Sequence, residues 1–99
     1  MGWMALADQV AEIEQEFIVT NQLGFHARVA AQIVKTASRF RSDIWLIKDE
    51  TTVNGKSILD VLSLQCPKGA TVKVLTRGED AEDALKAVAE LFQNKFGES

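Results

Sequence analysis

The alternation of apolar and polar residues divides most of the chain into short strands and amphipathic helices. Residues 17–20 are rich in β-forming side chains and run into Asn21-Gln22-Leu23-Gly24, which predicts a strand followed by a loop. Beyond the loop, apolar residues recur at helical spacing and polar residues fill the opposite face, which predicts an amphipathic helix. The apolar residues of that helix are Val29, Ala30, Ile33, Val34, Ala37 and Phe40.

Further along the chain, the same kind of pattern predicts three more strands and two more helices. The predicted strands are residues 43–47, 51–53 and 70–75. The predicted helices are a short one over residues 57–65 and a long one that follows Asp80 and carries apolar residues from Ala84 to Phe96. The first two of these strands form a hairpin, because only Lys48-Asp49-Glu50 separates them. Asp80 is the expected N-cap of the last helix.

Residues 1–16 precede this pattern and are predicted as an N-terminal extension. Leu6, Val10 and Ile13 have the spacing of one helical face, and both an accessory helix and a frayed tail fit that spacing. Met1 and Met4 are both possible start residues, so an origin of residues 1–4 in the expression vector also stays open. Residues 17–96 are predicted to form the folded domain and residues 97–99 a C-terminal tail.

The predicted order β-α-β-β-α-β-α defines an α+β fold. Each helix has an apolar face that must be buried, and an open sheet with all the helices packed on one side buries these faces in a single core. The opposite face of the sheet is expected to be more polar, although Trp45 and Ile47 have to be accommodated. With 99 residues, the chain is expected to form one domain whose core needs no disulfide or metal.

Composition narrows the classes of function. Hydrophobic residues make up 46% and charged residues 25% of the chain, which excludes an intrinsically disordered protein. The net charge of -3 argues against a nucleic-acid binder that uses a general basic field. Cys66 is the only cysteine and His26 the only histidine, so neither a disulfide nor a zinc site is expected. Without a signal peptide or a membrane-length apolar run, the pattern favours a cytoplasmic protein with no direct membrane insertion.

Candidate chemistry centres on Gly24-Phe25-His26-Ala27-Arg28, where the first loop meets the first predicted helix. A helix N-terminus attracts anions through its unpaired N–H groups and its dipole, and Arg28 can add charged donors to a phosphate. A neutral histidine ring nitrogen is a nucleophile, so phosphoryl transfer to His26 needs no separate base. Structural alternatives stay open: His26 as a capping or solvent-exposed residue, Arg28 as a solvated residue, and Gly24 as a turn glycine with positive φ.

Residues 24–30, Gly-Phe-His-Ala-Arg-Val-Ala, resemble the active-site signature of the HPr family, Gly-(Leu/Ile)-His-Ala-Arg-Pro-Ala. Residues 53–64 are similar to the regulatory serine segment of that family. The resemblance covers residues 17–96 and implies an open-faced β-sandwich, in which three helices cover one face of a four-stranded antiparallel sheet. It also implies a phosphocarrier of bacterial sugar transport rather than a stand-alone enzyme, working without a cofactor and as a monomer.

The resemblance implies that His26 accepts a phosphoryl group on its pros nitrogen, Nδ1, from phosphorylated enzyme I, which phosphoenolpyruvate charges. His26 then donates the group to a sugar-specific enzyme IIA domain, while Arg28 stabilises the phosphate. Val29 departs from the signature, since it stands where the family has proline. Valine frees φ and keeps an N–H, so the site is either less pre-organised or gains one donor.

Ser57 and the apolar residues after it form a second candidate site. Ser57 and Asp60 make a loose capping-box pattern, so the plain structural interpretation of Ser57 is a helix cap. The family resemblance implies that an ATP-dependent HPr kinase/phosphorylase modifies this serine, and the added charge would act on partners. An apolar docking surface for partners is expected around His26, unless some of its members belong to the core. Its expected members are Phe25, Ile58, Leu59 and Leu62, with Leu59 the strongest candidate for exposure.

Two further interpretations stay open. The chain could be a regulatory or nitrogen-branch HPr-like protein, which shares the chemistry but not sugar uptake. It could instead be a small, non-catalytic α+β interaction domain whose histidine is incidental. An RNA-binding domain is disfavoured, because the chain offers few aromatic residues and little basic clustering for the predicted sheet.

Overall fold

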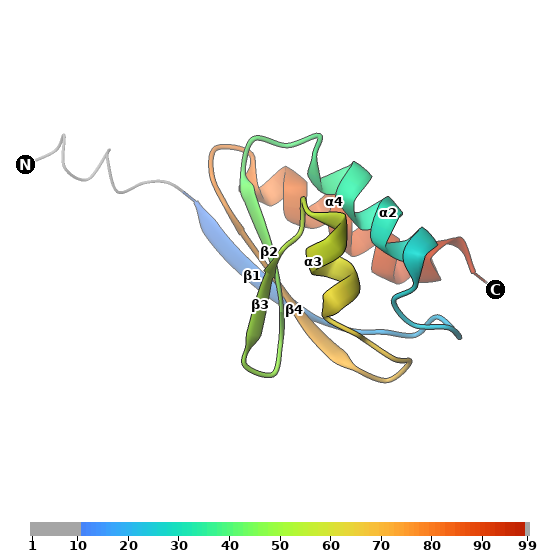
Figure 1. Cartoon of the computed structure of the whole chain (residues 1–99). Coiled ribbons are helices and arrows are strands. Elements are labelled where there is room, and N and C mark those ends of the chain that lie inside the picture. Colours follow the sequence, from blue (N-terminus) through green and yellow to red (C-terminus); the bar gives the residue numbers. More distant parts are fainter. Residues whose placement is uncertain (1–10, 99) are drawn as a thin grey trace, which may run out of the picture.

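The computed structural model describes residues 11–98 and confirms the predicted order of elements within the folded domain (Figure 1). Its elements are β1 (Glu12–Ile18), α2 (Ala27–Ala37), β2 (Asp43–Lys48), β3 (Thr51–Asn54), α3 (Ile58–Ser63), β4 (Thr71–Arg77), α4 (Ala81–Gln93) and a short 3-10 helix, η1 (Lys95–Gly97). Among these residues, no helix has both the length and the apolar character needed to cross a membrane.

The strands form one four-stranded sheet in the order β1-β4-β2-β3, and every neighbouring pair is antiparallel. Helices α2, α3 and α4 lie together on one side of this sheet (Figure 1). Helix α4 packs along β1 and β4, while α2 packs against both α3 and α4. The predicted α+β fold, an open-faced sandwich of one sheet and one helical layer, is therefore confirmed.

Strand alternation sends one set of side chains into the core and the other set to the open face of the sheet. Leu46 of β2 pairs with Val74 of β4, and both side chains are fully buried beneath the helices. Trp45 and Ile47, the next residues on either side of Leu46, lie on the open face and are half-buried. Trp45 pairs with the half-buried Leu75 in the register. The open face is therefore polar at its edges but apolar near its centre.

The start of β1 corrects the prediction for the N-terminal extension. Strand β1 begins at Glu12, so residues 12–16, predicted as the end of an extension that is either helical or frayed, belong to the sheet. In the register, Ile13 pairs with the buried Thr76 and Phe17 with the buried Val72. Pairing with β4 thus overrides the helical spacing of apolar residues that ends at Ile13. Residues 1–10 of the predicted extension lie outside the described residues.

The last helix begins after Asp80 as predicted, but the Asp80 side chain and the end of the helix differ from the prediction. Asp80 occupies the N-cap position of α4, but its side chain makes no capping hydrogen bond. Its carboxylate instead accepts hydrogen bonds from the Arg41 N–H (3.0 Å), the Ser42 N–H (2.9 Å) and the Ser42 hydroxyl (2.5 Å). These bonds, led by that of the Ser42 hydroxyl, lower the pKa of Asp80 to about 2. At the other end α4 stops at Gln93, and the buried Phe96 reaches the core from η1.

The loop between β1 and α2 is fixed against the segment that follows α3. The Phe25 N–H donates to the Cys66 carbonyl at 2.8 Å, and the Phe25 ring packs against Phe92 and Phe96. Gly24 has a φ of +66°, which agrees with its interpretation as a turn glycine. A Cβ at Gly24 would lie 2.3 Å from the Cys66 carbonyl oxygen, so the close approach admits no larger residue. These contacts fix the backbone position of His26, the residue that follows Phe25.

Cys66 itself is buried beside this contact. Burial raises the pKa of its thiol to about 11, with Lys48 opposing the shift and Asp49 adding to it. The thiolate is the reactive form of cysteine, so little reactive Cys66 is present near neutral pH.

We expect Gly24→Ala to destabilise the fold by about 2 kcal/mol or more, because left-handed backbone is costly for alanine and the Cys66 carbonyl blocks the new Cβ. Gly69 offers a matched control, since its φ is also positive (+94°) but no described atom lies within 4 Å of its Cβ position. Urea unfolding of both alanine variants measures the difference. Equal losses of stability would contradict the importance of the close approach at Gly24.

We expect the Cys66 thiol to react with an aromatic disulfide reagent at least about 100-fold more slowly in the folded protein than in urea. The reason is that a pKa of about 11, in place of the ordinary 9.0, leaves far less thiolate at a given pH. The rate of thiolate release is followed by absorbance at neutral pH. A folded protein that reacts as fast as the unfolded chain would show that Cys66 is not shielded.

Candidate functional site

His26 occupies the N-cap position of α2, between the fixed loop and the first helical turn. Its backbone is extended, with φ -118° and ψ 179°, and its carbonyl accepts a hydrogen bond from the Ala30 N–H at 2.9 Å. The imidazole makes no capping hydrogen bond, and the first turn of α2 carries no acidic residue. The N–H groups of that turn are thus not capped by His26 and can receive an anion beside the ring.

The imidazole is in contact with Glu98, which lies 72 positions later in the chain. His26 Nε2 and Glu98 Oε2 are 2.5 Å apart. The same oxygen lies 3.3 Å from Arg28 Nη2 and accepts a hydrogen bond from Asn21 Nδ2 at 3.2 Å. Three side chains therefore converge on one carboxylate oxygen, and the Glu98 side chain is only 9% exposed.

The donors around Glu98 favour its ionised form. The hydrogen bond from His26 is the largest cause that lowers the pKa of Glu98 below its ordinary value of 4.5, and bonds from Asn21 and the Leu23 backbone add to it. Burial acts in the opposite direction without reversing the shift. The carboxylate is therefore negatively charged at neutral pH and can only accept hydrogen bonds.

The turn after α4 brings Glu98 to this position. Residues 95–97 all have positive φ, at 52°, 55° and 79°, although such a left-handed backbone costs roughly 1–2 kcal/mol for each residue other than glycine. Phe96 is buried, with its ring edge-on to Phe92 at 5.0 Å between centroids. Its carbonyl also accepts a hydrogen bond from Gln32 Nε2 of α2 at 3.1 Å. Core contacts of Phe96 thus hold the turn that carries Glu98.

Arg28 and Val29 follow His26 on α2 but have different surroundings. The Arg28 side chain is 58% exposed, so most of its guanidinium can reach a phosphate. Val29 is fully buried in the core. The Val29 N–H belongs to the first turn, where backbone N–H groups have no partner inside the helix. Valine therefore supplies a donor at this helix end that the signature proline lacks.

Ser57 caps α3, as its structural interpretation predicts. The Ser57 hydroxyl accepts a hydrogen bond from the Asp60 N–H at 3.4 Å. Only half of a capping box is formed, because the Asp60 carboxylate accepts from the Asn54 N–H at 3.2 Å rather than from Ser57. Ser57 thus has a structural role that needs no modification.

The predicted apolar surface is present in part. Leu59 is 76% exposed and Ile58 is also exposed, whereas Leu62 is half-buried against the core. The expectation that Phe25 contributes an exposed ring is wrong, since its ring is buried in the aromatic part of the core. Leu23, which the sequence pattern does not single out, is 71% exposed. Among the described residues, the large apolar side chains that are exposed therefore come from the loop before α2 (Leu23), from α3 (Ile58 and Leu59) and from the end of β1 (Ile18).

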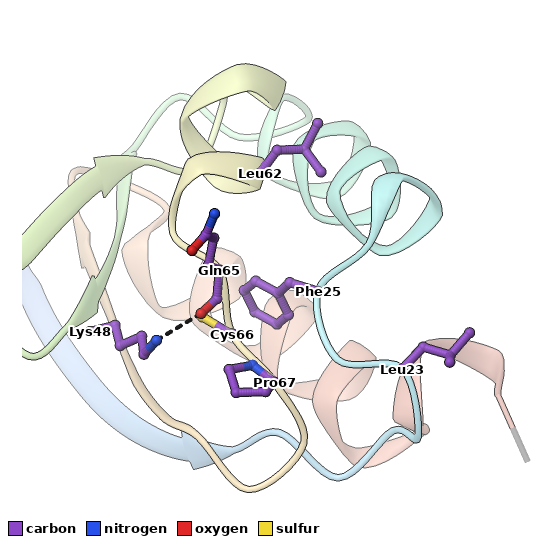
Figure 2. Close-up of a pocket in the computed structure, with 7 residues that line it drawn as sticks. All are labelled: Leu23, Phe25, Lys48, Leu62, Gln65, Cys66 and Pro67. Atoms are coloured by element: carbon purple, nitrogen blue, oxygen red, sulfur yellow. Dashed lines mark hydrogen bonds between the residues drawn. The ribbon is translucent and has the colours of Figure 1, made fainter.

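A pocket lies between that loop and the segment after α3 (Figure 2). Leu23, Phe25 and Leu62 line it together with Cys66 and Pro67. On its other side, Lys48 Nζ donates to the Gln65 carbonyl at 2.7 Å, as the dashed line in Figure 2 shows. The pocket thus combines apolar walls with a lysine at its edge.

Sequence patterns single out His26, Arg28 and Ser57, but they miss the residues that approach the site from elsewhere. Glu98 falls in the predicted C-terminal tail, and its local pattern carries no sign of a partner on α2. The structure shows instead that Glu98 contacts the His26 imidazole through its carboxylate. Asn21 stands in the predicted loop, and the frequent use of asparagine side chains to bond nearby backbone is the one signal that could have marked it.

The family model of the phosphorylation site of the phosphotransferase-system (PTS) HPr component matches residues 13–94. A phosphocarrier protein HPr of Xylella fastidiosa is 44% identical over 86 residues, which cover 87% of this chain and 97% of the relative. A phosphocarrier protein NPr of Shewanella violacea is 33% identical over 90 residues, which cover 91% of this chain and 99% of the relative. Similar proteins thus bear both the HPr and the NPr names.

Solved structures of HPr proteins share the fold. HPr from Thermoanaerobacter tengcongensis superimposes with a TM-score of 0.85 at 45% identity, covering 88% of this chain and 98% of that structure. An HPr dimer from the same organism gives a TM-score of 0.71 at 48% identity, covering 81% of this chain and 92% of that one. Because a dimer is among the similar structures, the comparison does not support the expected monomer.

Proposed function

The chain belongs to the HPr family of phosphocarrier proteins, and we propose that it carries a phosphoryl group on His26 within the bacterial phosphoenolpyruvate-dependent phosphotransferase system. The observation that carries the proposal is the position of the imidazole at a helix N-terminus that it does not cap, beside an exposed arginine. A phosphate on the ring would meet the helix dipole, the first-turn N–H groups and the guanidinium.

We assign Nδ1, the pros nitrogen, as the reacting atom, because Nε2 is engaged with Glu98. The lone pair of Nδ1 forms a bond to phosphorus while the bond between phosphorus and the donor breaks, and the electron pair of that bond leaves with the donor. The reverse exchange with the next protein restores the free ring. Such a transfer depends on positioning and charge stabilisation more than on further catalytic groups.

Enzyme I as donor and enzyme IIA domains as acceptors are the partners proposed for the sugar-transport branch. Exposed Leu59, Ile58 and Leu23 support docking of a protein partner on the side of α3 and the loop before α2. A nitrogen-branch carrier is the second candidate, which the similarity to an NPr protein supports. It would use the same chemistry with other partners, and a cytoplasmic location fits both branches.

Phosphorylation of Ser57 by an ATP-dependent HPr kinase/phosphorylase is proposed as a means of control. The position of Ser57 as the N-cap of α3 supports this, since a phosphate is tolerated at a helix N-terminus and the fold should survive. Ile58 and Leu59 follow Ser57 directly and are exposed. A phosphate on Ser57 would therefore add negative charge beside the apolar residues that are proposed to meet a partner.

Incubation with enzyme I and phosphoenolpyruvate is expected to place an acid-labile phosphate on the chain, measured by radiolabel transfer. His26→Ala is expected to abolish labelling, because it removes the acceptor atom. Arg28→Ala is expected to slow labelling at least about 10-fold, because it removes charged donors to the phosphate. Arg41→Ala is the control, since that side chain is 89% exposed and follows the other end of α2.

A parent chain that takes up no acid-labile phosphate, or a His26→Ala variant that is labelled normally, would contradict the proposed function. Rates with enzyme I of the sugar branch and with its nitrogen-branch counterpart separate the two candidates. The physiological donor is expected to label the chain faster by at least about 10-fold, as matched charge patterns raise association rates by such factors.

Ser57→Asp is expected to slow phosphoryl transfer from enzyme I about 10-fold at low salt, because it places a negative charge beside the docking residues that would repel an acidic surface of enzyme I. The loss should shrink as ionic strength rises, since salt screens exposed charges. Thr52→Asp is the matched control, an exposed threonine on β3. Equal transfer rates for the parent chain and Ser57→Asp at every ionic strength would argue against electrostatic control at Ser57.

A further inference from the structure

The contact between His26 and Glu98 involves the ring nitrogen that the proposed transfer does not use. Glu98 Oε2 lies 2.5 Å from Nε2, while the proposed acceptor atom, Nδ1, is on the other side of the ring. The pKa of Glu98 is lowered mainly by this same contact, so the carboxylate is ionised and can only accept a hydrogen bond. Nε2 must therefore carry a proton.

We propose that Glu98 is a positioning residue for phosphoryl transfer, which holds the His26 imidazole in its Nε2–H tautomer and in one orientation so that Nδ1 presents a lone pair. A neutral imidazole has one donor and one acceptor nitrogen, and the partner of one nitrogen decides the state of the other. This role rests on the proposed carrier function, because it concerns the reactivity of the same histidine.

Contacts that do not involve His26 impose the position of Glu98. Phe96, two residues earlier, is buried in the core, and its carbonyl is bound by Gln32. Asn21 donates both to Glu98 and to the Gly24 carbonyl (2.7 Å), which ties the carboxylate to the loop that carries His26. The left-handed backbone of residues 95 and 96 persists only where its surroundings determine it. The carboxylate is thus presented to the ring by the fold.

The distances also argue against the opposite role, in which the carboxylate takes the place of the phosphate and blocks the site. A blocking anion would draw its shortest bonds from the donors that bind phosphate. The contact of Glu98 with Arg28 is 3.3 Å, much longer than the 2.5 Å to the ring. Arg28 also stays 58% exposed, so its guanidinium remains accessible to a phosphate.

The electron and proton balance of the transfer fits this assignment. The proton stays on Nε2 while the Nδ1 lone pair bonds to phosphorus, and the electron pair of the broken bond leaves with the donor. The ring, bonded at both nitrogens, is then positively charged. The Glu98 carboxylate faces this charge across the Nε2–H bond and stabilises it. When the phosphoryl group moves on, the lone pair returns to Nδ1 and the ring becomes neutral.

Nitrogen-15 NMR of the unphosphorylated full chain, at a pH where the ring is neutral, tests the tautomer directly. We expect a protonated Nε2 and an unprotonated Nδ1 in the parent chain. Glu98→Ala is expected to move the two nitrogen shifts toward each other, as both tautomers become populated. Glu50→Ala is the matched control, an exposed glutamate in the turn between β2 and β3. A proton on Nδ1 in the parent chain, or unchanged shifts in Glu98→Ala, would overturn the proposal.

Single-turnover phosphorylation by enzyme I supplies the second measurement. We expect Glu98→Ala to lower the maximal rate about 10-fold with little change in KM, as the loss of an orienting partner of a functional histidine does elsewhere. Glu98→Gln keeps an acceptor oxygen and is expected to recover part of the rate. Faster phosphorylation of either variant would overturn the proposal in favour of the blocking role. If the parent chain is not phosphorylated at all, the proposed function fails, while NMR still decides the tautomer.

Discussion

Four phenylalanine rings pack into one aromatic cluster, and the geometry of the candidate site depends on this packing. Phe17 stacks on Phe92 with ring centroids 4.6 Å apart, and Phe96 meets Phe25 and Phe92 edge-on at 5.8 and 5.0 Å. Phe25 directly precedes the histidine, and Phe96 lies two residues before the glutamate. Aromatic pairs of this kind combine large buried area with a preferred geometry. Apolar packing therefore sets the distance between the imidazole and the carboxylate, although neither belongs to the cluster.

The features of this chain that have local causes could be predicted from the sequence. The spacing of Val29, Ala30 and Ile33 follows from one buried helical face, and all three side chains are fully buried. Gly24 has the positive φ that its place in a tight loop requires, and Ser57 caps the helix that begins after it. Each of these outcomes depends on neighbours within about one helical turn, which the sequence displays directly.

The features that depend on distant partners could not be predicted. The spacing of apolar residues up to Ile13 suits a helix, and only the pairing with β4 makes residues 12–16 a strand. Asp80 has the chemistry of an N-cap, but the backbone of Arg41 and Ser42 competes for its carboxylate and prevails. Glu98 reaches His26 through a turn whose backbone is unfavourable by itself and is fixed by core contacts. Tertiary contacts decided all three cases, and local propensity favoured another outcome.

The exposure of the His26 ring, the proposed phosphoryl acceptor, constrains how a carrier of this shape can exchange the phosphoryl group. The His26 side chain presents 29% of its surface to solvent, and the chain itself covers the remainder. Two macromolecules cannot both contact one partly covered imidazole, so the proposed donor and the proposed acceptor of the phosphoryl group would exclude each other. Each cycle then includes the departure of the first occupant before the second can arrive. A complex that dissociated slowly would delay the next transfer step, so the residence time of each partner limits the rate of the cycle more than its affinity does.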